Sequence, residues 1–257
     1  MSAGRLIVWR HGRTEWNLQD KIQGQADIPL DSVGVSQARA AATRLATLAP
    51  TRLFASDLRR AAATAGELAA LTGLKIEYDE ALREIDVDDW AGLTMAELGA
   101  INPEAAARIR NGEPQRRGTA GETVEEVADR FAAALKRICS EGTSEDTIVI
   151  TAHGLAARVG ICLFLGIPHA HWPAFGGLSN CNWISLLPGR NHRWRIEEWN
   201  AGSLPEPVMS DDPQQSERSP AAVLQLTSPG IQPIFLCREV SAKLPESQDT
   251  AGLWRSW

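Results

Sequence analysis

The sequence predicts an α/β fold, because short apolar runs alternate with alanine-rich stretches in which apolar residues recur at helical spacing. Two of the apolar runs, at 6–9 and 146–151, lead directly into a histidine–glycine pair, with His11 and His153 as the histidines. Open α/β sheets bind ligands at the carboxyl ends of their parallel strands, and glycine lets the backbone approach a bound group. The repeated pattern therefore predicts a ligand site at one edge of a sheet.

In the first half of the chain, capping residues and a glycine bound the predicted helices. Asp31 or Ser32 is placed to cap the first long helix, and Gly73 to end the second. The elements predicted here are a strand at 6–9, a helix at 36–48, a strand at 52–55, a helix from Ser56 to about Leu71, and a strand at 75–78.

Two capping boxes mark helix starts in the second half, Thr94 with Glu97 and Thr123 with Glu126. The elements predicted here are a short helix after Thr94, a helix at 104–110, a helix from Thr123 to about Cys139, a strand at 146–151, a helix at 155–165, and strands at 182–187 and 193–199. From Ser203 onward, seven of the fourteen prolines and no clear periodicity predict an irregular or disordered tail at 203–257.

Composition limits the function classes. A formal net charge of -6 over 257 residues argues against a nucleic-acid partner, and no run is apolar and long enough to cross a membrane. No signal peptide is recognisable at the N-terminus. The four cysteines are scattered without a Cys-x-x-Cys pair, so a reduced, cytoplasmic setting is expected: they are Cys139, Cys162, Cys181 and Cys237.

The polar residues that follow the predicted strands form one chemical set: Arg10, His11, Arg60, Glu84 and His153. Guanidinium groups suit phosphoryl oxygens, and phosphoryl transfer depends on positioning and on neutralising those oxygens. A neutral imidazole is a nucleophile toward phosphorus, and the two arginines disfavour its cationic form. A carboxyl beside a bound phosphate dianion is easier to protonate, which suits a general acid for the leaving oxygen.

The sequence resembles the histidine phosphatase superfamily, in its phosphoglycerate mutase-like branch. The motifs that carry the resemblance run from residue 5 to about 201: 10–17 (RHGRTEWN), 23–30 (QGQADIPL), 56–61 (SDLRRA), 82–84 (LRE) and 152–154 (AHG). Segments 172–183 and 194–200 resemble one subgroup of that family, the glucosyl-3-phosphoglycerate phosphatases.

The resemblance implies a fold and a set of roles. It implies a three-layer α/β/α sandwich with a mostly parallel sheet at 1–202, a small helical cap at about 90–121, and no metal or other cofactor. His11 is the implied nucleophile and Glu84 the proton donor. The implied phosphate ligands are Arg10, Asn17, Arg60 and His153, with Gln23 at the rim.

The expected function is metal-independent hydrolysis of a small phosphorylated metabolite, such as a sugar phosphate or a phosphoglycerate derivative, through a phosphohistidine. A cofactor-dependent phosphoglycerate mutase and a non-catalytic phospho-ligand-binding protein are the alternatives. Resemblance to relatives that pair makes a homodimer an expectation, with segment 172–183 as its candidate face.

Several residues have both a structural and a functional interpretation. Asn17 suits a turn cap as well as a ligand, and Glu84 could pair with Arg83. His169 and His171 lie two apart without further ligands at metal-site spacing, which favours a loop. Three arginines suit either a solvated loop or a grip on a second anionic group of the substrate: Arg110, Arg116 and Arg117.

Overall fold

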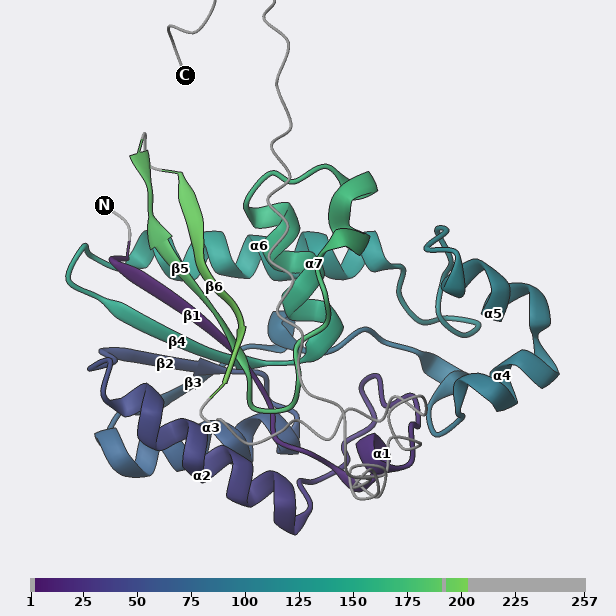
Figure 1. Cartoon of the computed structure of the whole chain (residues 1–257), viewed down its shortest axis with the longest axis horizontal. Helices are drawn as coiled ribbons and strands as arrows, with labels where there is room; N and C mark the ends of the chain where they lie inside the picture. Colours follow the sequence, from purple (N-terminus) through teal and green to yellow (C-terminus); the bar gives the residue numbers. More distant parts are fainter. Residues whose placement is uncertain (1–2, 191–192, 203–257) are drawn as a thin grey trace, which may run out of the picture. The chain divides into compact units, whose positions relative to one another are not determined.

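A six-stranded mixed sheet forms the centre of the fold in the computed structural model, which describes residues 3–190 and 193–202 (Figure 1). The predicted tail at 203–257 lies outside the described residues. The strand order is β3-β2-β4-β1-β5-β6. The strands are β1 (Arg5–Arg10), β2 (Arg52–Ala55), β3 (Ile76–Tyr78), β4 (Thr147–Ala152), β5 (Trp183–Pro188) and β6 (Trp194–Ala201).

The pairing confirms a mostly parallel sheet. Strands β3, β2, β4 and β1 run parallel to one another, whereas β5 is antiparallel to β1 and β6 is antiparallel to β5. In the register of β1 with β4, Arg10 lies opposite Ala152. The residues that follow the two strands, His11 and His153, are therefore neighbours although 141 positions separate them in sequence.

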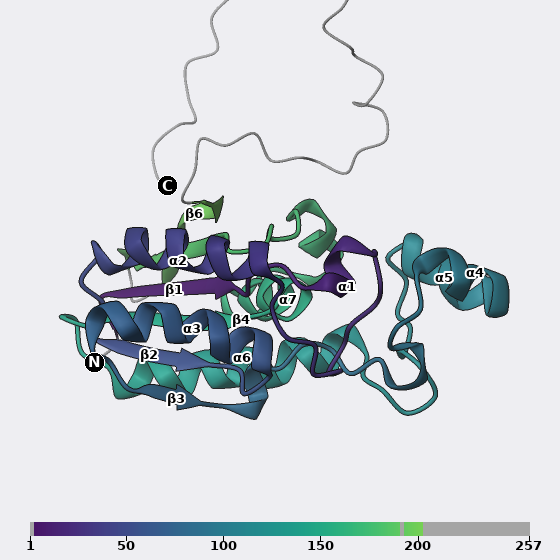
Figure 2. The same cartoon turned by 90° about the horizontal axis from the view of Figure 1, so that it is seen from below.

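Helices cover both faces of the sheet, so the three-layer sandwich is confirmed (Figure 2). Leu6 and Val8 of β1 belong to the apolar core on the side of α6 and α7, whereas Ile7 and Trp9 belong to the core on the side of α2 and α3. The side-chain alternation of a strand divides the apolar residues in this way. The helices are α1 (Glu15–Leu18), α2 (Ser32–Ala46), α3 (Arg59–Thr72), α4 (Met95–Ile101), α5 (Pro103–Arg110), α6 (Val124–Glu141) and α7 (Gly154–Phe164).

Local capping chemistry explains most helix ends. Both predicted capping boxes are present, at Thr94 for α4 and at Thr123 for α6. Helix α2 starts at Ser32, earlier than the predicted residue 36, because the Asp31 carboxylate accepts a hydrogen bond from Gly34 N at 2.7 Å. Gly73 ends α3 with φ of 72°, a backbone conformation that suits glycine.

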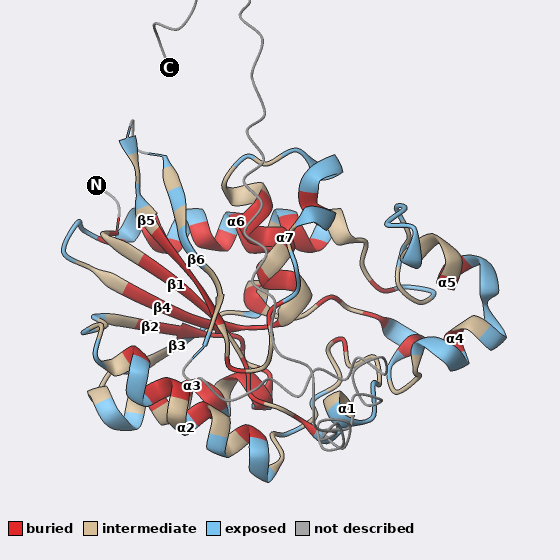
Figure 3. Cartoon of the chain, viewed as in Figure 1, coloured by how far each residue is buried: buried red, intermediate tan, exposed pale blue. Residues whose placement is uncertain are grey.

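Helices α6 and α7 pack closely at Gly160. A Cβ at this position would lie 2.4 Å from Cδ1 of Phe131, which is buried in α6, so only glycine fits the contact. Figure 3 shows the resulting buried seam between the sheet and these two helices. The close contact fixes α7, whose N-terminal end follows His153, against the rest of the domain.

Helices α4 and α5 lie apart from the sheet and from both helical layers (Figures 1 and 2). They fall in the segment at about 90–121 for which the family resemblance implies a cap. Three short 3-10 helices, none of them predicted, connect the larger elements: η1 (Glu80–Leu82), η2 (Asp88–Trp90) and η3 (His169–Ala174). No helix among the described residues combines the length and apolar character needed to cross a membrane.

Candidate active site

His11 follows β1 and is only 3% exposed. Its Nδ1 lies 2.7 Å from the carbonyl oxygen of Gly12. Because a carbonyl oxygen only accepts hydrogen bonds, Nδ1 must carry the proton, and Nε2 of the neutral ring keeps its lone pair. The local backbone therefore selects the tautomer in which Nε2 carries the free lone pair.

His153 follows β4 and is completely buried beside His11, with ring centroids 5.1 Å apart and ring planes inclined by 59°. Its Nε2 lies 2.9 Å from Oγ of Ser56, which follows β2. Its Nδ1 is buried and has no hydrogen-bond partner among the described residues. Three strand ends thus meet at this point, and a buried polar atom there remains available for a ligand.

Burial is the main reason why both imidazoles stay neutral. Removal from water lowers the pKa of His11 and of His153 well below the ordinary value, and the charge of Arg60 lowers both further. Arg10 acts in the same direction on both rings. The sequence predicts a neutral nucleophile because of the arginines, but the structure adds burial as the larger cause.

Arg60 is completely buried near the start of α3, whereas the adjacent Arg59 is exposed. Its two terminal nitrogens donate to the carbonyl oxygens of Gly24 (2.6 Å) and Ala26 (2.7 Å). Burial lowers the pKa of Arg60 to about 10, so the group stays charged at neutral pH. The Arg60 guanidinium is therefore a fixed positive charge beside both histidines.

Arg10, at the end of β1, donates through Nη1 to the carbonyl oxygen of Leu178. Its Nε, like that of Arg60, is buried without a hydrogen-bond partner among the described residues. Buried donors in this state are typical of a site that takes an anion. We call the group Arg10, His11, Arg60, Glu84 and His153 the phosphate site.

The Glu84 carboxylate lies at the N-terminal end of α7. Its Oε1 accepts from the backbone N–H of Ala156 at 3.0 Å and its Oε2 from that of Leu155 at 3.1 Å. Glu84 and Arg10 line the same cavity of about 300 Å³. The suggested structural pairing of Glu84 with Arg83 is not found, because Arg83 instead forms an ion pair with Asp57.

Arg130 of α6 holds the backbone that carries Glu84, a contact that the sequence analysis missed. Its guanidinium donates to the carbonyl oxygens of Ala81 (2.9 Å), Arg83 (2.7 Å) and Glu84 (2.8 Å), and it forms a 2.7 Å ion pair with Glu122. A charged residue three positions after Val127, at the i, i+3 spacing of the apolar face, is a signal that could have indicated it.

Asn17 serves the structure through its oxygen. Its Oδ1 accepts from the backbone N–H of Thr14 at 3.1 Å, and Asn180 donates to the same oxygen at 3.3 Å and to the carbonyl oxygen of His11 at 3.1 Å. The Oδ1 atom of Asn17 therefore acts as a turn cap, as one of the two interpretations predicts. Only Nδ2 of this side chain is left to bind a ligand. Gln23 precedes the Gly24 carbonyl that Arg60 binds, and its Oε1 is buried without a partner among the described residues.

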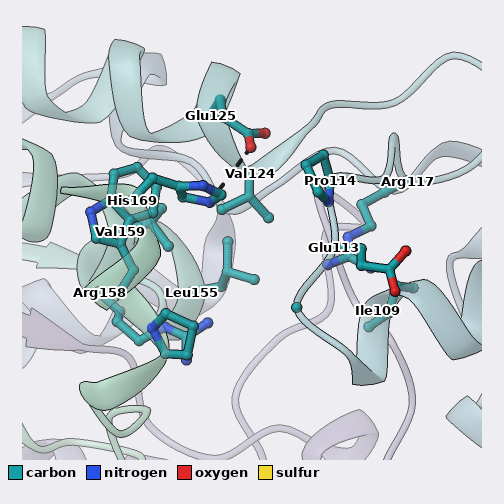
Figure 4. A pocket seen from close by; sticks show the side chains of 13 residues that line it. Ile109, Glu113, Pro114, Arg117, Val124, Glu125, Leu155, Arg158, Val159 and His169 are labelled. Carbon is teal, nitrogen blue, oxygen red and sulfur yellow. Dashed lines mark ion pairs between the residues drawn. The ribbon is translucent and has the colours of Figure 1, made fainter.

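The three candidate arginines of the cap segment have different environments. Arg110 is exposed, and Arg116 pairs with Glu126 at 2.6 Å. Arg117 lines a further cavity, which we call the second cavity; it lies between loop 112–117 and α7 with η3 (Figure 4). His169 lines it too and contacts Glu125 at 3.5 Å.

No cluster of three or more metal-binding side chains occurs at 3–190 and 193–202.

Comparison with known proteins gives consistent matches. The sequence profile of the histidine phosphatase superfamily (branch 1) matches residues 6–202. The glucosyl-3-phosphoglycerate phosphatase of Mycolicibacterium vanbaalenii is 35% identical over 219 residues, which cover 79% of this chain and 97% of the relative. A Proteus mirabilis protein named "Probable phosphoglycerate mutase GpmB" is 33% identical over 198 residues, or 76% of this chain and 89% of the relative.

Solved structures agree with these matches. A mycobacterial glucosyl-3-phosphoglycerate phosphatase complexed with VO3 superposes with a TM-score of 0.70 at 38% identity, covering 77% of this chain and 99% of that one. A phosphoserine phosphatase of Entamoeba histolytica, in complex with 3-phosphoglyceric acid, superposes with a TM-score of 0.68 at 27% identity, covering 77% and 96%.

Proposed function

The chain belongs to the histidine phosphatase superfamily (branch 1), and from this premise we propose that it hydrolyses small phosphate monoesters through a phosphohistidine on His11. Relatives named glucosyl-3-phosphoglycerate phosphatase and phosphoserine phosphatase share its fold, and the chain is a phosphatase of small phosphorylated metabolites. The roles of individual residues in the reaction are the proposal.

One observation supports the proposal most directly: His11 is a neutral imidazole whose Nε2 is left free by the Gly12 contact, and it lies 5.1 Å from the ring of His153. A site that only bound phosphate would need positive charge but neither a nucleophile of fixed tautomer nor a carboxyl group nearby. The combination with Glu84 therefore favours catalysis over binding alone.

In the first step, Arg10, Arg60 and His153 bind the oxygens of the substrate phosphate. Nε2 of His11 attacks the phosphorus in line, the N–P bond forms, and the bond to the alcohol oxygen breaks while Glu84 donates a proton to that oxygen. The guanidinium groups neutralise charge on the equatorial oxygens as the bonds change.

In the second step, the Glu84 carboxylate accepts a proton from water, whose oxygen attacks the phosphorus. The N–P bond breaks, which releases phosphate and restores neutral His11. Glu84 is then protonated again and ready for the next substrate. Asn17 through Nδ2 and Gln23 at the rim complete the proposed phosphate contacts.

The proposal is tested by phosphate release from 4-nitrophenyl phosphate and by trapping radiolabelled, acid-labile phosphoprotein. We expect His11→Ala to abolish both signals, whereas the exposed His171→Ala variant keeps both. Circular dichroism should show that each variant is folded. Unchanged turnover in folded His11→Ala would exclude His11 as the nucleophile.

The mutase alternative is tested with 3-phosphoglycerate in the presence of bisphosphoglycerate. A mutase would form the isomer without releasing phosphate, whereas we expect phosphate release without isomer. A non-catalytic phospho-ligand-binding protein would give neither product and would still bind inorganic phosphate in calorimetry.

Three finer expectations extend the proposal: residues 1–202 act as the catalytic domain with a cap at about 90–121, the chain is cytoplasmic, and it pairs as a homodimer. Cytoplasmic location is supported by buried free thiols at Cys139, Cys162 and Cys181.

Trp172 and Trp183 are buried in the chain's own core, so a dimer face at 172–183 would use the other residues of that segment. Light scattering of the purified protein tests the pairing.

A further inference from the structure

The second cavity has a mixed lining, with apolar side chains and several charged ones. Figure 4 shows Arg158 and Leu155 of α7 on one side of it and Arg117 and Glu113 on the other. Its volume is about 100 Å³. A concave site with an apolar lining and a few convergent charged groups is typical of a small-molecule site.

The two arginines that line this cavity differ in their charge environment. The Glu125 carboxylate attracts Arg117 and also lies 3.5 Å from His169, whereas Glu113 lies 3.7 Å from Arg108. Arg158, by contrast, has no ion-pair partner among the described residues. The Arg158 guanidinium is therefore the charge in this lining that a ligand can neutralise.

Of the two arginines, Arg158 is the better candidate to bind a ligand. Its Nε is buried without a hydrogen-bond partner among the described residues. Its only hydrogen bond to those residues is a long one, 3.5 Å from Nη1 to the carbonyl oxygen of Phe175. A planar guanidinium with free donors binds carboxylates in a two-pronged geometry.

The second cavity adjoins the phosphate site. Leu155 and Arg158 line both the second cavity and the 300 Å³ cavity that contains Arg10 and Glu84. Arg158 lies one helical turn after the backbone N–H groups that hold the Glu84 carboxylate. The shared lining leaves a path along which a substrate bound at the phosphate site can extend toward Arg158.

We propose that Arg158 binds a carboxylate carried by the non-phosphate part of the substrate, with the second cavity holding the atoms beyond it. The preferred substrates are then phosphate monoesters of hydroxy acids rather than of neutral alcohols. The proposal rests on the proposed function and narrows its substrate class. It assigns Arg158 as a specificity-determining residue.

The test compares two substrates that differ at one group, 3-phosphoglycerate and glycerol 3-phosphate, in which a hydroxymethyl group replaces the carboxylate. The readout is the ratio of their kcat/KM values, measured by phosphate release. We expect the wild type to favour 3-phosphoglycerate by roughly tenfold or more, as expected for one charge-assisted pair. Arg158→Met should bring the ratio close to one.

Matched variants distinguish the effect of the Arg158 charge from a structural effect of the substitution. Arg158→Lys keeps a cation and should retain part of the preference, whereas the exposed cap variant Arg110→Met should keep the wild-type ratio. An equal loss on both substrates in Arg158→Met leaves the ratio unchanged and overturns the proposal. A wild type without preference for 3-phosphoglycerate overturns it as well.

A binding experiment keeps this proposal distinct from the proposed function. In a His11→Ala background, calorimetry should show that Arg158→Met weakens binding of 3-phosphoglycerate roughly tenfold more than binding of glycerol 3-phosphate. Equal weakening overturns the carboxylate contact. If the wild type fails to hydrolyse even 4-nitrophenyl phosphate, the proposed function fails, but this binding difference is still measurable.

Discussion

The phosphate site and the second cavity lie side by side but are built in different ways. In the phosphate site, His11, Arg60 and His153 are at most 3% exposed and follow strands or begin a helix. The second cavity is formed by loop 112–117 and by side chains of helices, and the side chain of His169 there is 46% exposed. The backbone fixes the positions of the groups in the phosphate site, whereas the second cavity is shaped by side chains.

The difference has a physical basis. The sheet register places the histidines, and the carbonyl oxygens of Gly24 and Ala26 hold the Arg60 guanidinium, so a small displacement is energetically costly. Long side chains on helices and loops can be exchanged with little change to the core. We therefore expect substitutions in the phosphate site to affect every substrate, and those in the second cavity to affect the choice among substrates.

After the complete loss expected for His11→Ala, the largest effect is expected for Glu84→Gln, which keeps the shape of the side chain but removes the transferable proton. Turnover of an alkyl phosphate should fall by roughly 10²–10⁴, the range typical of a lost general acid. The activated ester 4-nitrophenyl phosphate, whose leaving group needs little protonation, should be slowed less. Steady-state rates on both substrates provide the measurement, and equal slowing would contradict the acid role.

A smaller loss is expected for Arg130→Met, which releases the backbone at 81–84. We expect kcat to fall by about 10–100-fold with little change in KM, because Glu84 is displaced while the phosphate contacts remain. The loss should be greater for alkyl than for aryl esters, which a purely structural role would not produce.

The matched control for Arg130 is Arg137→Met on the same helix, where the arginine pairs with Asp79 at the surface and is 52% exposed. This variant should keep wild-type kinetics. If both variants lose kcat to a similar extent, the loss results from removing a positive charge from α6 and not from losing the contact with Glu84.

Buried neutral histidines also make stability depend on pH. Because the folded protein holds the pKa of His11 and His153 well below 6.5, the unfolded chain binds more protons than the folded one just below that pH. The free energy of unfolding should therefore fall as the pH drops below about 6.5, by up to about 1.4 kcal/mol per pH unit for each histidine. Urea unfolding between pH 5 and pH 7.5 measures the slope.

Removing one of these histidines should reduce that slope. In His11→Asn, the slope of the unfolding free energy against pH should fall by the contribution of one histidine. The exposed His171→Asn variant should keep the wild-type slope. The same slope in His11→Asn and the wild type would show that His11 is not held neutral by its surroundings.

The smallest effect is expected for Ser56→Ala, which removes the hydroxyl that contacts Nε2 of His153 at 2.9 Å. One such hydrogen bond contributes about 1 kcal/mol, so kcat/KM should fall by roughly fivefold on all substrates. Ser185→Ala is the control, because its buried hydroxyl has no hydrogen-bond partner among the described residues. A change in the preference between substrates, instead of a uniform loss, would weaken the contrast between the two regions.

Much of the fold could be predicted because its signals are local. The apolar run of β1, the capping boxes at Thr94 and Thr123, and the glycine after α3 each act within a few residues. The predicted starts of helices differ by a few residues where a cap, such as Asp31, takes effect earlier than the apolar pattern. The short helices α1 and η3 were missed because they are too brief to show a period.

The five residues of the phosphate site could also be named from the sequence, because each lies near the end of a predicted strand or the start of a helix and carries a chemically specific group. By itself, the sequence thus determined the type of fold and named the candidate reacting groups, since both depend on local pattern. Only the tertiary structure decided which tautomer His11 holds, how Arg130 fixes Glu84, and that Arg158 faces both cavities. These are contacts between residues far apart in the chain or between side chain and backbone, and no local pattern encodes their geometry.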